Sequence, residues 1–139
     1  SYEEGTFTPT VTYAGNAASM TFSEQEGRYT KIGRVVTCSM VISQTARGTS
    51  TGNMRLGGLP FTSDNDSGDR MQGMITYFGG MNGIRNNMTL YNVTNSTYVF
   101  AYDTNSTSQD ASTIRTITHS NCDSSGMHIR CWVRYHAGG

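Results

Sequence analysis

The stretch Gly27-Arg28-Tyr29-Thr30-Lys31-Ile32-Gly33-Arg34-Val35-Val36 runs directly into Thr37-Cys38-Ser39-Met40-Val41-Ile42, and this part of the chain decides the fold. Over residues 35–42 the side chains alternate, because successive residues of a strand point to opposite faces. One expected face is apolar and consists of Val36, Cys38, Met40 and Ile42. This period of two predicts a core strand. Gly33 before it predicts a bulge or a corner.

Alternation of the same kind recurs on both sides of this stretch. We expect strands at 6–13, 18–23, 28–32, 54–56, 71–78, 88–93, 98–102, 112–119 and 127–136. Pro9 lacks an N–H donor, which predicts that its strand lies at a sheet edge. The segment 24–27, with Glu24, Glu26 and Gly27, is expected to be a polar turn, and 44–53 a polar loop. Short strands separated by turn signals predict an all-β fold, an antiparallel β-sandwich of jelly-roll type.

Composition limits the function classes. The 139 residues carry no formal net charge and only 14% are charged, whereas Ser and Thr make up 35 residues. This length predicts one domain. A balanced charge argues against nucleic acid as a partner, since such binding relies on neutralising phosphates. No apolar run is long enough for a membrane span, so we expect no membrane insertion. The chain opens in strand-like sequence, and we expect it to be a domain of a longer protein.

Three short stretches together resemble a known family. They are Glu3-Glu4-Gly5-Thr6-Phe7-Thr8-Pro9-Thr10-Val11, the run from Gly27 to Val36, and Leu59-Pro60-Phe61, within roughly the first sixty residues. This cadence resembles the C-terminal knob domain of tailed-bacteriophage tail fibres and tailspikes. The resemblance implies a single knob domain over residues 1–139 and a homotrimer. It also implies a place at the distal end of the fibre or spike in the virion, after assembly in the host cytoplasm.

The resemblance further implies a function in host recognition. We expect non-covalent adhesion to a host-surface glycan, such as lipopolysaccharide or capsular polysaccharide. Two alternatives stay open. The domain would otherwise be a structural trimerisation and stability cap for an upstream shaft or depolymerase domain, or a tail-needle knob.

The last expected strand has two distinct faces. One is apolar, and the other carries His128, Arg130, Trp132, Arg134 and His136. Trp132 is the only Trp of the chain. Trp and Arg are enriched at the centres of protein contact surfaces. We therefore predict a subunit interface at His128, Arg130, Trp132 and Arg134, with a binding face for an acidic sugar as the alternative.

Polar loops of the second half are the expected ligand-binding segments, since loops on a rigid scaffold often carry recognition. They span 63–70, 79–87, 103–112 and 120–126. Aromatic rings stack on sugar rings, and Asn, Asp and Arg bond to sugar hydroxyls. The predicted glycan-binding residues are Tyr77, Arg85, Asn86, Tyr102 and Asp103.

Residue patterns for metal, cofactor or catalytic chemistry are weak. Asp64, Asp66 and Asp69 approach a calcium loop, but Ile75 stands where that loop needs a bidentate Glu. The chain has no catalytic motif of the common hydrolases. We expect no metal, no cofactor and no enzyme activity. The three Cys residues lack C-x-x-C spacing, and Cys38 and Cys131 are expected to be packed, reduced thiols.

Overall fold

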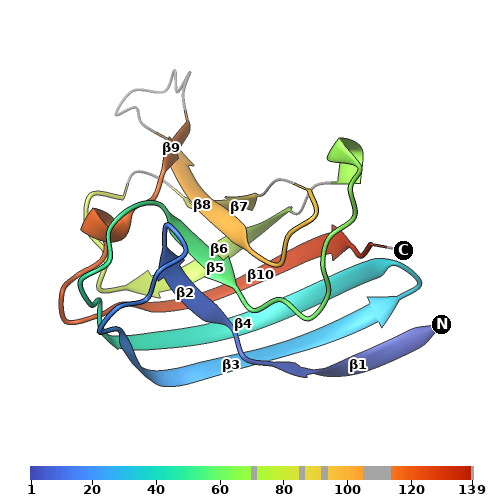
Figure 1. The fold of residues 1–139 in the computed structure, drawn as a ribbon, viewed down its shortest axis with the longest axis horizontal. Coiled ribbons are helices and arrows are strands. Elements are labelled where there is room, and N and C mark those ends of the chain that lie inside the picture. The colour runs from blue at the N-terminus through green and yellow to red at the C-terminus, as the bar shows by residue number, and fades with distance from the viewer. Residues whose placement is uncertain (70–71, 85–86, 92–93, 105–113, 139) are drawn as a thin grey trace.

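The computed structural model describes residues 1–69, 72–84, 87–91, 94–104 and 114–138 (Figure 1). The strands are β1 (Tyr2–Phe7), β2 (Thr10–Tyr13), β3 (Thr21–Ile32), β4 (Val35–Ala46), β5 (Met54–Gly57), β6 (Gln72–Gly79), β7 (Thr89–Tyr91), β8 (Val99–Thr104), β9 (Ile114–Thr116) and β10 (His128–His136). Two short 3-10 turns, η1 (Ser67–Asp69) and η2 (His119–Asn121), complete the described elements. Within these residues no helix is long and apolar enough to cross a membrane. The all-β prediction is confirmed.

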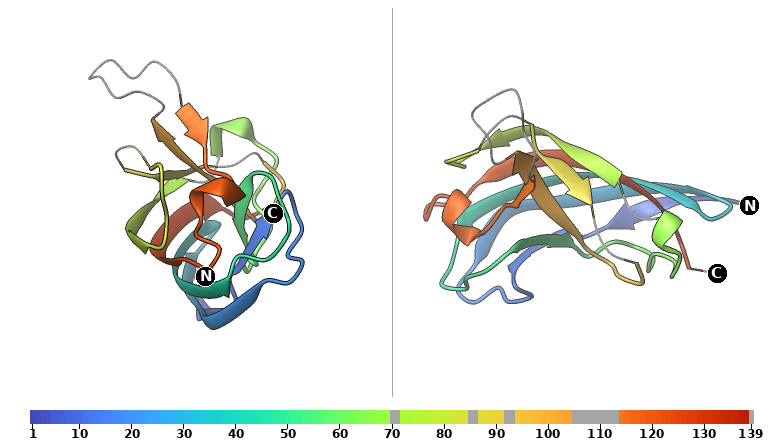
Figure 2. Two further views of the ribbon diagram at one scale, coloured as in Figure 1. Left: turned by 90° about the vertical axis from the view of Figure 1, so that its left-hand side faces the viewer. Right: turned by 90° about the horizontal axis from the view of Figure 1, so that it is seen from above.

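All described strands belong to one antiparallel sheet. Its order is β1-β3-β4-β10-β6-β7-β8-β5-β2, with β9 paired to β8. The sheet curls into a half-barrel, so that its inner face closes on a single core (Figures 1 and 2). The expected sandwich of two sheets is therefore wrong. Alternation predicts that each strand buries one face, and a single curled sheet meets that requirement as well as two stacked sheets do.

The core consists of the inward side chains of this sheet. The predicted core-facing side of residues 35–42 consists of Val36, Cys38, Met40 and Ile42, and all four are buried in this core. The strand itself is longer than predicted, since β4 continues to Ala46. The neighbouring strand β10 contributes Ile129, Cys131, Val133 and Tyr135 in the same alternation.

Gly27 does not turn the chain as expected. Strand β3 runs straight through it, and Gly27 pairs with Phe7 on β1 and with Met40 on β4. A Cβ on Gly27 would lie 2.6 Å from the ring of Phe7. The glycine therefore makes room for an aromatic ring rather than for a bend. As a result, Glu24 and Glu26 lie on the sheet and not in a polar turn.

Pro9 divides the first expected strand into two. Strand β1 ends at Phe7 and β2 begins at Thr10, and the two lie at opposite ends of the strand order. The prediction was a single edge strand that contains Pro9. The structure has two strands instead, one on each side of Pro9, and both are edge strands. The carbonyl of Pro9 accepts a hydrogen bond of 2.8 Å from the side chain of Gln25.

The two termini lie at the same end of the half-barrel (Figure 1). The β3–β4 hairpin turns there at Gly33 and Arg34, and Gly33 has a φ of 60°. This is the corner predicted at Gly33. The Gly33 N–H donates to the Ser1 carbonyl, and the Ala137 N–H to the Arg34 carbonyl. The opposite end is formed by η2 and the loops 14–20, 47–53, 80–84 and 122–127 (Figures 1 and 2).

Candidate functional site

The predicted glycan-binding residues do not form one cluster. Tyr77 lies on β6 with 59% of its surface exposed. Arg85 and Asn86 fall outside the described residues. Tyr102 and Asp103 are consecutive on β8 and point to opposite faces of the sheet: Tyr102 is half-buried towards the outer face, and Asp103 is buried on the inner one.

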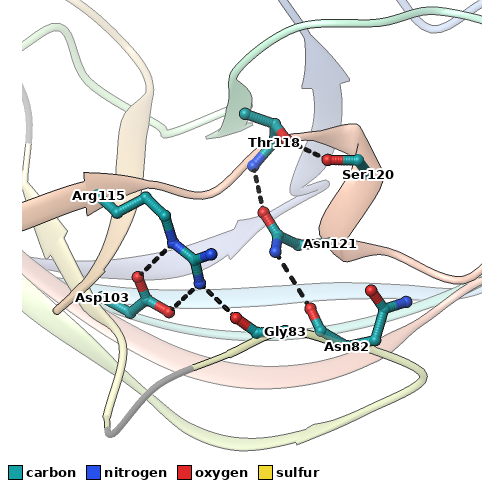
Figure 3. A network of polar contacts seen from close by, with 7 residues as sticks. All are labelled: Asn82, Gly83, Asp103, Arg115, Thr118, Ser120 and Asn121. Carbon is teal, nitrogen blue, oxygen red and sulfur yellow. Dashed lines mark hydrogen bonds and ion pairs between the residues drawn. The ribbon is translucent and has the colours of Figure 1, made fainter. Parts of the chain in front are cut away.

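The enclosed carboxylate of Asp103 forms an ion pair with Arg115 of β9, whose side chain is partly exposed. The Arg115 Nε lies 2.9 Å from one carboxylate oxygen and its Nη2 lies 2.5 Å from the other (Figure 3). The same guanidinium donates to the carbonyl of Gly83. Hydrogen bonding to the Asp103 carboxylate raises the pKa of Arg115. The Asp103 side chain has no exposed surface, and through Arg115 the ion pair joins β8, β9 and loop 80–84.

A second set of bonds joins η2 to the same loop. The Asn121 amide donates to the Asn82 carbonyl at 3.1 Å and accepts from the Thr118 N–H at 3.0 Å (Figure 3). The Asn82 side chain donates in turn to Asp123 at 2.9 Å. The loops 80–84 and 118–123 are thus cross-tied, and this end of the molecule is preorganised.

The residues predicted as a subunit interface all lie on the outer face of β10. Trp132 is 39% exposed, and Arg130 and Arg134 on either side of it are exposed as well. His128 is half-buried, and its Nδ1 lies 2.5 Å from the Ser43 hydroxyl of β4.

Tyr77 joins this outer face. Its ring meets His128 edge-on, with 5.7 Å between the ring centroids. A bulge in the pairing of β6 with β10 places Tyr77 opposite Arg130. The structure therefore brings one predicted sugar-binding residue next to two of the predicted interface residues.

Sequence reasoning missed the strands that complete this surface. On the outer face Ser39 of β4 lies between Arg28 of β3 and Trp132 of β10, and Val41 lies between Glu26 and Arg130. The short side chains on β4 leave an open hollow of about 330 Å³ between longer ones. We call this surface the β4 trough; its floor is Thr37, Ser39 and Val41, and its walls are Glu26, Arg28, Arg130, Trp132 and Arg134.

A second hollow lies on the outer face beyond β6. It is an open groove of about 580 Å³, lined by Gln72, Gly73, Thr89, Leu90, Tyr91, Tyr102 and Ile114, with more apolar than polar surface. The Ile114 side chain is 69% exposed. No charged side chain lines this groove among the described residues. We call it the apolar groove.

The acidic loop uses Asp64 and Asp66 to hold its own backbone and the β3–β4 turn. Asp64 forms an ion pair with Arg34 and accepts from the Asp66 N–H at 3.1 Å. Asp66 accepts from the Gly68 N–H at 2.9 Å. This loop lies beside the chain termini, because the Asp64 N–H donates to the His136 carbonyl. In the described part of the chain, no three His, Cys, Asp or Glu side chains are grouped so as to hold a metal ion.

The three cysteines are unpaired and buried. The packing predicted for Cys38 and Cys131 is confirmed, and Cys122, expected in a loop, is buried too. Burial raises the pKa of Cys38 and of Cys131 to about 12. These thiols are thus protonated at neutral pH and have the character of small apolar side chains.

The fold of this chain is similar to that of a part of a known phage protein. The structure is similar to the crystal structure of the Dettilon tailspike protein (gp208), a phage tailspike, with a TM-score of 0.71 and 17% sequence identity. The match covers 97% of this chain and 24% of the tailspike chain, so this chain spans about a quarter of that protein's length. No protein-family model matches the sequence, and no curated protein matches it. The chain thus has the fold of a part of a phage tailspike.

Proposed function

We propose that this chain is the distal domain of a phage tail fibre or tailspike and that it adheres non-covalently to a host-surface glycan. Lipopolysaccharide and capsular polysaccharide are the glycans of this kind that we expect. The observation that carries the proposal is the likeness to a tailspike over 97% of the chain. The domain would act in the virion after assembly in the host cytoplasm.

The shape of the half-barrel suits this role. Both termini lie at one end, beside the β3–β4 turn, and cross-tied loops lie at the other (Figure 1). A shaft entering at β1 would leave these loops and the part of the outer face over β4 and β10 free to meet a cell surface. We propose a homotrimer, in which three weak sites on one rigid axis raise avidity by ~10²–10⁴.

We further propose that the domain acts without catalysis. Hydrolysis of a glycoside requires two placed carboxyl groups, one of them with a raised pKa. The two buried carboxylates of the described residues, Asp64 and Asp103, are each paired with an arginine. Both pairs hold loops together, which favours a structural use of these acids. We propose no cofactor and no metal for the same adhesive role.

Adsorption to bacteria tests the proposal. The fluorescently labelled domain is applied to a panel of bacterial strains, with purified lipopolysaccharide or capsule from each strain as competitor. We expect saturable adsorption to some strains, abolished by their own polysaccharide. Adsorption to no strain by a correctly folded trimer would contradict the adhesive function.

One observation favours a second candidate, a trimerisation and stability cap for an upstream shaft. The apolar groove exposes Ile114 and Tyr91, and an apolar hollow without charged lining suits contact with a second copy of the chain. This candidate predicts that removal of the domain destabilises the upstream shaft. Unchanged shaft stability after removal would rule it out.

A further inference from the structure

We propose that the β4 trough binds an acidic saccharide unit, with a sugar ring stacked on Trp132 and its carboxylate held by Arg28 and Arg130. This inference rests on the proposed adhesive function and adds the site and the ligand class. The sequence of β10 left two uses open for its outer face, a subunit interface and a binding face for an acidic sugar. This inference takes the second.

The shape of the trough comes from the order of side-chain sizes across three strands. The floor residues on β4 are short, whereas both flanking strands carry long side chains. Neighbouring strands lie ~4.8 Å apart, so the walls on β3 and β10 stand about 10 Å apart. This width accepts one ring lying over Ser39. Trp132 forms the wall at that point and faces Arg28 across the floor.

The arginines of the trough form no ion pair within the described residues. The ion pairs found among the described residues are Arg34–Asp64 and Arg115–Asp103. The guanidinium groups of Arg28, Arg130 and Arg134 therefore have no carboxylate partner in the described chain. A guanidinium is a planar fork of donors that matches a carboxylate in two parallel hydrogen bonds. Three arginines occupy positions that neighbour Trp132 in the sheet, which suits a sugar that carries a carboxylate.

Acidic residues on the same face limit this attraction. Glu26 lines the hollow opposite Arg130, and Glu24 lies further along β3, opposite Ser43. On the side of β6 the hollow is lined by Thr76, and Tyr77, which contacts the His128 ring, lies opposite Arg130. Glu26 repels an anion in the trough, so its charge provides a test of opposite sign to that of the arginines.

A subunit contact on this face would be costly. It would remove three guanidinium groups from water, and a buried charge without a partner is strongly destabilising. The apolar groove offers copies of the chain a surface without that cost. The two hollows therefore divide the outer face into a charged part for ligand and an apolar part for assembly.

Fluorescence of the single Trp measures binding at the site itself. The probes are oligogalacturonate, a neutral galactose oligomer of equal length and inorganic polyphosphate. We expect oligogalacturonate to change the Trp132 emission saturably, and the neutral oligomer to have no effect at the same concentrations. Because exposed charges are screened by salt, the affinity should fall between about 0.05 M and 0.5 M NaCl.

Substitutions assign the effect to the trough. Arg28→Gln and Arg130→Gln should each weaken oligogalacturonate binding about fivefold, which is about 1 kcal/mol. Glu26→Gln should strengthen it about twofold, because a repulsive charge is removed. Lys31→Gln is the matched control: it lies on the same strand as Arg28, removes the same charge and sits on the inner side over the Phe61 ring. Its affinity should equal that of the unaltered chain.

Three results would overturn the inference. Polyphosphate binding as tight as oligogalacturonate would show an anion site without selection for a sugar ring. An unchanged Trp132 signal with oligogalacturonate would remove the site. Loss of the trimer in Arg28→Gln or Arg130→Gln, seen by light scattering, would make this face the subunit interface. In each case adsorption of the domain to bacteria is measured separately, so the adhesive function can stand while the trough assignment fails.

Discussion

Gly73 of β6 shows how closely the strands approach one another. A Cβ at this position would lie 2.0 Å from the carbonyl oxygen of Trp132, which is a backbone atom that cannot turn aside. We predict that Gly73→Ala lowers the free energy of unfolding by at least about 2 kcal/mol, because the backbones of β6 and β10 must separate. Urea unfolding followed by Trp132 fluorescence measures this loss.

Gly79 provides the matched control on the same strand. Nothing lies within 4 Å of a Cβ built there. Gly79→Ala should change the free energy of unfolding by no more than about 0.5 kcal/mol. Equal losses for both alanine variants would contradict the close approach at Gly73.

The buried thiols give stability a defined pH dependence. Burial raises the pKa of Cys38 and Cys131 to about 12, above the ordinary value of 9.0. In the folded state both stay protonated when the unfolded chain has already lost these protons. Their contribution is therefore complete below pH 9 and is lost as the pH rises towards 12, by up to about 1.4 kcal/mol per pH unit for each thiol.

Urea unfolding at pH 7.5, 9 and 10.5, on the unaltered chain and on Cys131→Ala, checks this sign. The Ala variant should be less stable at neutral pH and should show a shallower alkaline decline. A stability that rises above pH 9, or an unchanged slope in Cys131→Ala, would contradict the burial of a protonated thiol.

Residues with a regular pattern around them were predictable. The buried set on residues 35–42 and the two faces of residues 128–136 follow from alternation alone, and the structure confirms both. Asp103 shows the opposite case. Alternation with Val99 and Ala101 places it on the buried face, but its partner Arg115 is on another strand and no local pattern identifies it.

At the scale of elements, the ion pair between Asp103 of β8 and Arg115 of β9 helps to hold the end of the molecule that lies opposite the termini. Arg115→Met would leave the enclosed Asp103 carboxylate without its partner. We predict a loss of about 3 kcal/mol in the free energy of unfolding, since an uncompensated buried charge is strongly destabilising. Chemical denaturation measures the loss.

The double variant Asp103→Asn with Arg115→Met serves as the control, because it removes both charges. It should be more stable than Arg115→Met alone. The single variant Asp103→Asn completes the comparison. If the double variant loses as much free energy of unfolding as the two single variants together, the two groups do not interact as the geometry requires.

Pairing between elements was the less predictable part of the fold. Gly27 was expected to turn the chain, yet β3 continues through it, and the ring of Phe7 from β1 occupies the space above it. The β4 trough was missed for the same reason, since Glu26 was expected in a polar turn and Arg28 at the start of a separate strand. Alternation continued through Gly27 would have placed both on one face. Whether the strands form one sheet or two depends on pairing between residues that are far apart in the sequence. Local patterns do not contain this information.

At the scale of the whole molecule, assembly is the property that the outer face should control. We predict that the domain is a trimer at micromolar concentration and that Ile114→Lys dissociates it, because a charge then enters the apolar groove. Ile32→Lys is the control, since Ile32 is 62% exposed on the outer face away from that groove. Light scattering gives the mass of each. A monomer for the unaltered chain, or a trimer for Ile114→Lys, would contradict this arrangement.

The measurement that tests the adhesive function most directly is binding of the trimer to an array of bacterial lipopolysaccharides and capsular polysaccharides. We predict selective binding to glycans that carry carboxylate sugars, with the signal reduced in Arg28→Gln and Arg130→Gln and retained in Lys31→Gln. A folded, trimeric sample that binds no glycan on the array would contradict the account and favour the structural cap.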